Sequence, residues 1–389
     1  MQLNDYQIDS AKASYLNFIS NCKVNDGEYS LTVGADSSPY ALCFAIFGLQ
    51  LLQQRQSLTM DCELYDSMLR SNLAQFRDKQ NASHINLHTD KPFLQLLAFT
   101  LSALSIIGTL KLNPLESYIA PLINKNPIKI FDDSGVFDGK AGTGNLAMFY
   151  GIILQHAREY LALNTERQIA QWVDKHISSM NRFGFWGNSK SMSHLQFQNG
   201  YHQYEIFEYL GVDSVPWDRA SEAVASLVDN EGHFAPYIGG GGCYDYDAIH
   251  ILTGAGLNDI EGYKNILNLT ANTILSEQNI DGGFCESLQV RPRSLVNILR
   301  STDHIFSAHG DARMERLRHA ITLLRPKHNR ISTHWSSYSR KWDESDLWDS
   351  WFRMLTIARI DISFDSSKIS RWGFIDYPGI GFHPLLKNC

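Results

Sequence analysis

The chain has 389 residues, of which 44% are hydrophobic and 19% are charged, a composition typical of a globular protein. Its 41 acidic residues outnumber its 34 Lys and Arg, and the formal net charge of -7 argues against nucleic acid as the main partner. The first residues, MQLNDYQIDSAKAS, do not combine a charged segment with a following apolar run, so we expect no secretory signal.

The most apolar stretch, residues 93–110, is interrupted by Gln95, Thr100 and two serines. It is therefore predicted to be a buried helix and not a membrane span. The six cysteines are scattered without a C-x-x-C pair, which is typical of reduced thiols. We expect a cytoplasmic protein without a transmembrane segment.

Short glycine-containing loops recur along the chain with a period near fifty residues. Gly135, Gly184, Gly232 and Gly283 are separated by 49, 48 and 51 residues. A strongly apolar helix is predicted after each loop, and a more amphipathic one, such as 166–180, before the next. The predicted apolar helices are 39–53, 92–108, 144–163, 195–211, 244–254, 294–306 and 345–360.

Strand patterns are nearly absent, so the repeating unit is a helical hairpin. Several of the apolar helices are hydrophobic on nearly all faces, which favours a ring that encloses them. We predict an all-α fold of about six hairpins closed into a double-layered ring, with the helix N-termini converging on one mouth. The ring is expected to form a single domain, with a tail from about residue 361 to 389, rich in glycine and aromatics, over one end.

The segment 278–284, QNIDGGF, resembles the Q-x-x-D-G-G-[FW] turn that recurs in terpenoid cyclases and protein prenyltransferase β-subunits. More degenerate copies are DNEGHF, NRFGFWG and DSGVF. The resemblance implies the α/α-toroid fold that these families share. Other α/α toroids act on carbohydrates, so the turn predicts the fold more directly than the function.

Four consecutive glycines precede a helix whose first turns carry ionisable side chains. Cys243, Asp247 and His250 have spacing i, i+4, i+7 and share one face, while Asp245 lies to one side. The segment 245–248, DYDA, is similar to the D-x-D-D motif of class II terpenoid cyclases, with Ala248 in the fourth position. That resemblance implies that Asp247 protonates an alkene or an epoxide. The alternative is that Asp245 caps the helix and His250 is a hydrogen-bonded core residue.

Cys243, Asp247 and His250 are also a candidate set of metal ligands, for zinc by analogy with protein prenyltransferases. The aspartate that precedes the cysteine in that family is replaced here by Gly241. The sequence leaves the cofactor open, with Zn or Mg as the candidates.

A second polar face lies on the predicted helix one repeat earlier. His194, Gln198, His202 and Glu205 fall at i, i+4, i+8 and i+11, with Tyr201 alongside. We expect this face next to the Cys243 helix. The alternative is a buried hydrogen-bonded network that fixes helix packing.

The last apolar helix carries Asp346, Asp349 and Arg353 on one face, with Trp348 and Trp351 near it. Asp349 and Arg353 are spaced as an i, i+4 ion pair. Tryptophan beside carboxylates suits either a sugar or a carbocation.

Basic residues precede two of the predicted inner helices. Arg293 and Arg340 lie in loops at the expected mouth, where they could hold a phosphate or carboxylate, or be solvated. The segment 137–145, FDGKAGTGN, does not have the residue order of a nucleotide-binding P-loop.

The patterns favour an enzyme that acts on a small molecule, with no nucleic acid partner. The first hypothesis is a terpenoid-cyclase-like or prenyltransferase-like enzyme with Asp247 as principal acid and Asp245, His250, His202 and Glu205 around it. The second is a carbohydrate-active lyase or hydrolase that uses paired carboxylates. The third is a non-catalytic scaffold. The residues expected to bind substrate are Cys243, Tyr201, His194, Trp348, Asp349, Arg353 and Arg293.

Overall fold

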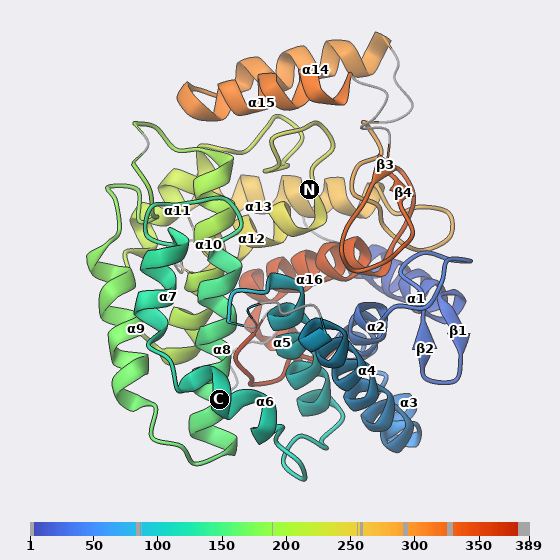
Figure 1. Cartoon of the computed structure of the whole chain (residues 1–389). Helices are drawn as coiled ribbons and strands as arrows, with labels where there is room; N and C mark the ends of the chain where they lie inside the picture. The colour runs from blue at the N-terminus through green and yellow to red at the C-terminus, as the bar shows by residue number, and fades with distance from the viewer. Residues whose placement is uncertain are drawn as a thin grey trace.

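The structure is a computed structural model, and it describes residues 4–82, 86, 88–188, 190–254, 256, 260–290, 295–324 and 330–379. Within these ranges the fold is helical, with two short β-hairpins at its edge (Figure 1). The inner helices are α2 (Pro39–Leu51), α5 (Lys91–Ile106), α8 (Gly144–Tyr160), α10 (His194–Leu210), α12 (Gly242–Gly254) and α16 (Leu347–Phe364).

The outer helices surround this inner layer and are more exposed. They are α1 (Asp5–Asn21), α4 (Cys62–Ala82), α6 (Glu116–Ile123), α7 (Pro127–Ser134), α9 (Glu166–Ser178), α11 (Trp217–Ala225) and α13 (Glu261–Ser276). The remaining elements are β1 (Lys23–Asn25), β2 (Glu28–Tyr29), α3 (Arg55–Met60), α14 (Leu295–Ser307), α15 (Gly310–Leu323), β3 (Arg330–Ile331), β4 (Arg340–Lys341) and a 3-10 helix (Ser366–Arg371).

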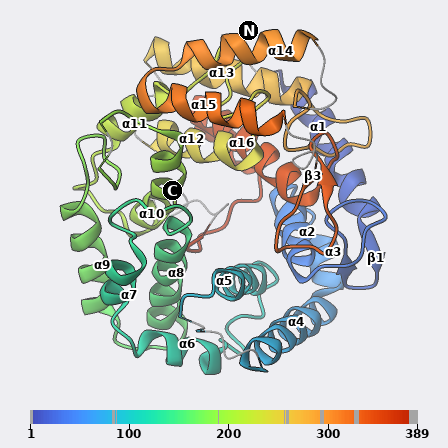
Figure 2. The ribbon, with the colours of Figure 1, turned by 45° about the horizontal axis from the view of Figure 1, so that its top comes forward.

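The inner helices close into a ring, as Figure 2 shows. Each packs on the next in the order α2, α5, α8, α10, α12 and α16, and α16 returns to α2. Helix α1 completes the outer layer, because it contacts α2, α13 and α16. The predicted all-α toroid is therefore confirmed.

Neighbouring inner helices begin side by side, as a parallel inner layer requires. The Tyr40 hydroxyl at the start of α2 donates to the carbonyl of Pro92 at the start of α5, at 2.7 Å. Gly144, the first residue of α8, packs so closely on α10 that a Cβ there would lie 1.8 Å from the carbonyl oxygen of Asn199. The polar helix starts therefore gather at one end of the ring.

The loops that recur about every fifty residues share one turn geometry. The backbone N–H groups of Asn181, Asp229 and Asn279 each donate to the carbonyl four residues ahead, at 2.7, 2.9 and 2.9 Å. Within each turn a glycine has φ between +82° and +89°, a conformation that favours glycine. These glycines are Gly184, Gly232 and Gly282. The sequence alignment on Gly283 was therefore wrong by one residue, because Gly283 is the carbonyl acceptor of its turn.

The turn that carries the terpenoid-cyclase resemblance joins the N-terminal helix α1 to the part of the ring formed by α13. Gln278 donates from Nε2 to the carbonyl of Gly282 at 2.8 Å and to that of Ala11 in α1 at 3.0 Å. A Cβ on Gly282 would lie 2.1 Å from the carbonyl oxygen of Ser14. The motif therefore fastens the first helix of the chain beside α13.

The prediction of an inner helix at 294–306 is wrong. Helix α14 pairs with α15 and lies outside the ring, across the top of the view in Figure 1. Leu299 and Phe306 on it are 68% and 65% exposed, so its apolar residues do not enter the core. Helix α12 packs directly on α16 instead, and the ring closes without α14.

The described part of the C-terminal tail crosses the end of the ring opposite the polar helix starts. The backbone N–H of Gly373 donates to the carbonyl of Leu51 at the end of α2, at 2.9 Å. Trp372 donates from Nε1 to Asp361 near the end of α16, and Tyr377 lies against His156 near the end of α8. Among the described helices, none has both the length and the apolar character needed to cross a membrane.

Replacing Gly144 by alanine tests the close packing of α8 on α10. The added methyl group has to push two inner helices apart, which we expect to cost about 1–3 kcal/mol of the free energy of unfolding. Gly262→Ala in α13 is the matched control, because a Cβ there meets nothing within 4 Å. Thermal unfolding followed by circular dichroism should show a lowered Tm for the first variant alone. Equal Tm values would contradict the packing.

Candidate active site

Helices α10 and α12 share a buried group of carboxyl, phenol and imidazole side chains. We call this group the acid cluster, and its members are Tyr201, Glu205, Tyr246, Asp247 and His250, none of them more than 5% exposed. Glu205 Oε1 accepts hydrogen bonds from the hydroxyls of Tyr201 at 2.7 Å and Tyr246 at 3.1 Å. Nδ1 of His250 lies 3.7 Å from the same oxygen. The two polar faces expected from the sequence therefore meet.

The four-glycine stretch allows α12 to begin in close contact with its neighbours. At Gly240, where φ is +68°, a Cβ would lie 2.2 Å from Nδ1 of His233 and 2.6 Å from Oδ2 of Asp245. At Gly242 it would lie 2.9–3.2 Å from atoms of Asp349 in α16. Glycine is needed at both positions because no side chain fits between these groups.

Burial raises the pKa of both carboxyl groups of the acid cluster. Desolvation raises the pKa of Glu205 to about 7, against the opposing effect of the Tyr201 hydrogen bond. Desolvation, with the nearby charges of Glu205 and Asp245, raises the pKa of Asp247 well above its ordinary value. Asp247 Oδ1 and Glu205 Oε2 make no hydrogen bond with any described residue. A neutral carboxylic acid with an uncommitted oxygen is the form that a general acid needs.

Asp245 lies on another side of α12 and has a different role. Its Oδ2 is 2.8 Å from Nδ1 of His233 and 2.7 Å from NH1 of Arg353, and its Oδ1 accepts the N–H of Phe234. Burial opposes charge on His233, but Asp245 and Glu277 outweigh it and raise the histidine pKa well above its ordinary value. The structure therefore places the predicted catalytic Asp245 in a network that fastens α12 to α16.

His202 and Cys243 lie near the acid cluster as neutral groups. His202 is 2.7 Å from the side-chain nitrogen of Asn145 in α8, and burial, together with Lys91, lowers its pKa to about 3. Burial, with the charge of Asp247, raises the pKa of the Cys243 thiol well above its ordinary value. Lys91 at the start of α5 lies close enough for its positive charge to oppose protonation of His202. Lys91 and Asn145 were missed from the sequence, because they are on α5 and α8 and come close to His202 only when the ring closes.

His194 was expected to bind substrate, but it anchors the α14–α15 hairpin. Its Nδ1 pairs with the carbonyl of Phe234 at 2.9 Å, and its Nε2 accepts from Arg316 of α15 at 3.3 Å. Burial, followed by the charge of Arg316, lowers the pKa of His194 well below its ordinary value. Arg293, the other basic residue expected at the mouth, lies outside the described residues.

The predicted i, i+4 pair of Asp349 with Arg353 is replaced by longer-range partners. Asp349 accepts from Arg340 at 2.7 Å, and Arg353 pairs with Asp245. Arg340 is buried rather than solvated, and it also lies 3.3 Å from Glu286. Glu286 was missed from the sequence, and burial, with the charge of Asp349, raises its pKa to about 8. It lies in a loop, where no helical spacing marks it.

An aromatic cluster continues from the acid cluster across α16, α2 and α5. Trp348 lies 4.4 Å from Phe352, 4.8 Å from Phe44 and 5.9 Å from Phe99, measured between ring centroids. Phe352 in turn lies 5.4 Å from Tyr246 of the acid cluster. One side of the inner layer is therefore acidic and phenolic, and the other is aromatic. Trp348 is where the sequence predicts an aromatic face.

Tyr246 was also missed. It lies one helical turn before His250 on the same face of α12, so the i, i+4 spacing could have identified it.

Among the described residues, no group of three His, Cys, Asp or Glu side chains is arranged to hold a metal ion. The alternative that Cys243, Asp247 and His250 form a zinc site is therefore not supported by the geometry.

No protein-family model matches the chain, and no curated protein matches its sequence. Solved structures do match it. A glycosidase in complex with glucose superposes with a TM-score of 0.51 at 13% identity, over 93% of this chain and 100% of the other. A type II terpene cyclase from Scytonema, in complex with geranylgeranyl dihydroxybenzoate, gives 0.48 at 10% identity, over 92% and 97%. At 13% identity the likeness to the glycosidase shows the fold alone, an α/α toroid.

Glu205→Gln tests the protonation of the acid cluster through stability. Because the folded-state pKa is raised from 4.5 to about 7, the folded protein keeps a proton that the unfolded chain loses, and stability falls as pH rises through that range. Glutamine does not titrate. We therefore expect the variant to gain about 1–3 kcal/mol relative to the wild type between pH 5 and pH 8 in urea unfolding. Parallel stability profiles would show that Glu205 titrates normally.

Proposed function

We propose that the protein is a terpenoid-cyclase-like enzyme in which Asp247 is the general acid and the substrate is an apolar, alkene-containing small molecule. The observation that carries the proposal is the burial of Asp247, which raises its pKa, in an acid cluster that adjoins an aromatic cluster through Tyr246 and Phe352. The similarity of the segment 245–248 to the D-x-D-D motif supports it, because Asp247 is in the position of the acid. Prenyl transfer is the related chemistry that the same apolar substrate class would allow.

Asp247 would start the reaction by protonating one carbon of an alkene. The O–H bond breaks, a C–H bond forms, and the π bond supplies its electron pair, which leaves a carbocation on the neighbouring carbon. A second alkene of the same molecule closes a ring onto that cation, and transfer of a proton from carbon to water ends the sequence. The product is an isomer of the substrate. Asp247 regains its proton from water.

The other residues would position the acid and stabilise the cation. Glu205, held by Tyr201 and Tyr246, and His250 form the polar surroundings of Asp247. The faces of Trp348 and Phe44 can stabilise positive charge on the substrate. In this proposal Asp245 and Arg353 are positioning residues, because they fix the start of α12, and Cys243, Tyr201 and Trp348 line the path of the substrate.

A second candidate is a carbohydrate-active hydrolase. Two buried carboxyl groups of the acid cluster, Glu205 and Asp247, would supply the pair that glycoside hydrolysis uses. The glycosidases that share the fold support this alternative at the level of the fold alone. Hydrolysis adds the elements of water, whereas cyclisation leaves the mass unchanged, so product mass separates the two. The cytoplasmic location and the absence of a nucleic acid partner stay predictions from composition and charge.

The experiment is incubation with polyprenyl substrates that carry a terminal alkene or epoxide, and in parallel with oligosaccharides. We expect a cyclic isomer of a polyprenyl substrate that gains one deuterium on carbon when the reaction runs in deuterium oxide. Asp247→Asn keeps the volume of the side chain but has no acidic proton, so turnover should fall at least a thousandfold while Tm stays nearly unchanged.

Asp213→Asn is the matched control, because Asp213 is exposed on the loop after α10 and should leave turnover intact. A fully active Asp247→Asn protein would remove this residue from the mechanism. Sugar products in place of cyclic isomers would favour the hydrolase.

A further inference from the structure

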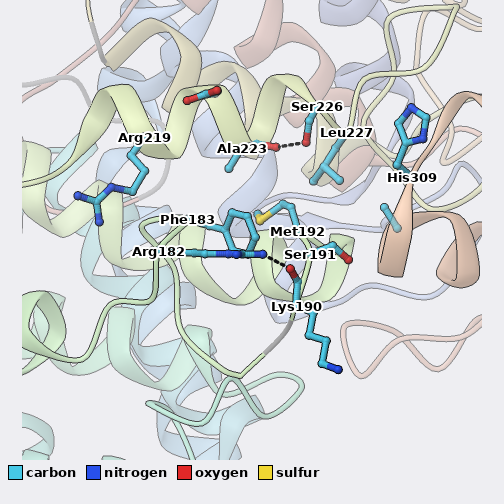
Figure 3. A pocket seen from close by; sticks show the side chains of 12 residues that line it. Arg182, Phe183, Lys190, Ser191, Met192, Arg219, Ala223, Ser226, Leu227 and His309 are labelled. Atoms are coloured by element: carbon cyan, nitrogen blue, oxygen red, sulfur yellow. Dashed lines mark hydrogen bonds between the residues drawn. The ribbon is translucent and has the colours of Figure 1, made fainter.

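A pocket outside the ring carries an unexplained concentration of positive charge. It has a volume of about 450 Å³ and lies where the loop 182–192 and helix α11 meet the start of α15 (Figure 3). None of its lining residues belongs to the acid cluster. The pocket exists because the α14–α15 hairpin packs beside the ring.

The floor of the pocket is apolar. Met192, Leu227 and Ala312 are buried beneath it, and Phe183 stands at its centre in Figure 3. A pocket of this size with an apolar lining is typical of a site for a small organic molecule. The apolar floor therefore gives a hydrocarbon group a place to bind.

The rim of the pocket is cationic. Arg182, Lys190 and Arg219 line it against a single carboxylate, Glu222, so its lining carries a formal charge of +2 in a chain whose net charge is -7. None of the three cations forms an ion pair with a carboxylate among the described residues. The charges are therefore available to an anion from outside the chain.

Two features hold this rim in place. The Arg182 guanidinium lies over the Phe183 ring, 4.7 Å from its centroid, and donates to the carbonyl of Lys190. Helix α15 begins at Gly310 beside the pocket, and Asp311 in its first turn joins it to the loop. The Asp311 N–H donates to Ser191 Oγ at 2.8 Å, and the Asp311 carboxylate accepts the Ser191 N–H at 3.4 Å. The guanidinium forks of Arg182 and Arg219 match the oxygens of a phosphate.

We propose that this pocket binds an organic phosphate, with the phosphate at the cationic rim and an apolar group on the Met192–Leu227 floor. The inference goes beyond the proposed function, because it needs neither Asp247 nor turnover. Binding would also hold the α14–α15 hairpin to the ring, since the pocket is lined from both.

Isothermal titration calorimetry with hexyl phosphate, inorganic phosphate and hexanol tests the proposal on the full chain. We expect hexyl phosphate to bind at least tenfold more tightly than either fragment, because it fills both halves of the pocket. The double variant Arg182→Gln, Arg219→Gln should weaken binding at least tenfold. Arg167→Gln on the exposed face of α9 is the matched control and should change it less than twofold.

Lys190→Gln alone provides a second, milder variant and should weaken binding about threefold or more. Absence of binding to the wild type, or equal binding by the wild type and the double variant, would overturn the proposal. Inorganic phosphate that binds as tightly as hexyl phosphate would overturn the assignment of the apolar floor. Circular dichroism of each variant confirms that the compared proteins are folded.

Discussion

The contact between the start of α12 and α16 is the constraint on which the ring and the acid cluster both depend. Asp245 reaches Arg353 at 2.7 Å, and Gly242 lets the backbones approach without a side chain between them. This contact closes the inner layer directly from α12 to α16, past the inserted α14–α15 hairpin. Because a helix is rigid, fixing one side of α12 also turns the side with Asp247 toward α10.

Two aspartates only two residues apart are thereby put in opposite electrostatic surroundings. Asp245 faces the cations Arg353 and His233, so its negative charge is compensated. Asp247 faces the carboxyl group of Glu205 and apolar surroundings, which penalise a second negative charge. Pairs of carboxyl groups whose surroundings differ in this way are how a fold keeps an acid ready at neutral pH. The ring thus creates the acid through packing.

The sequence was sufficient to predict the ring, six of the seven proposed inner helices and the pairing of two polar faces, because these follow from periodicity. The sequence-based predictions were wrong where contacts between distant parts of the chain determine the position of a helix or the partner of a side chain. Helix α14 has the apolar content of an inner helix but lies outside, since α12 and α16 already close the ring. The i, i+4 spacing of Asp349 and Arg353 predicts a local pair, yet Arg340 and Asp245 are better placed partners in the folded chain. His194 likewise serves an inserted hairpin whose position the sequence does not reveal.

The central claim is that Asp247 is a neutral carboxylic acid in the folded protein at pH 7. A carbon-13 NMR titration with aspartate labelled at its carboxyl carbon measures this directly, and the Asp247→Asn spectrum assigns the signal. We predict a carboxyl resonance for Asp247 that stays at its protonated position through neutral pH, because burial raises its pKa well above the ordinary value. A resonance that titrates in the ordinary range of aspartate would contradict the claim and leave the ring without its acid.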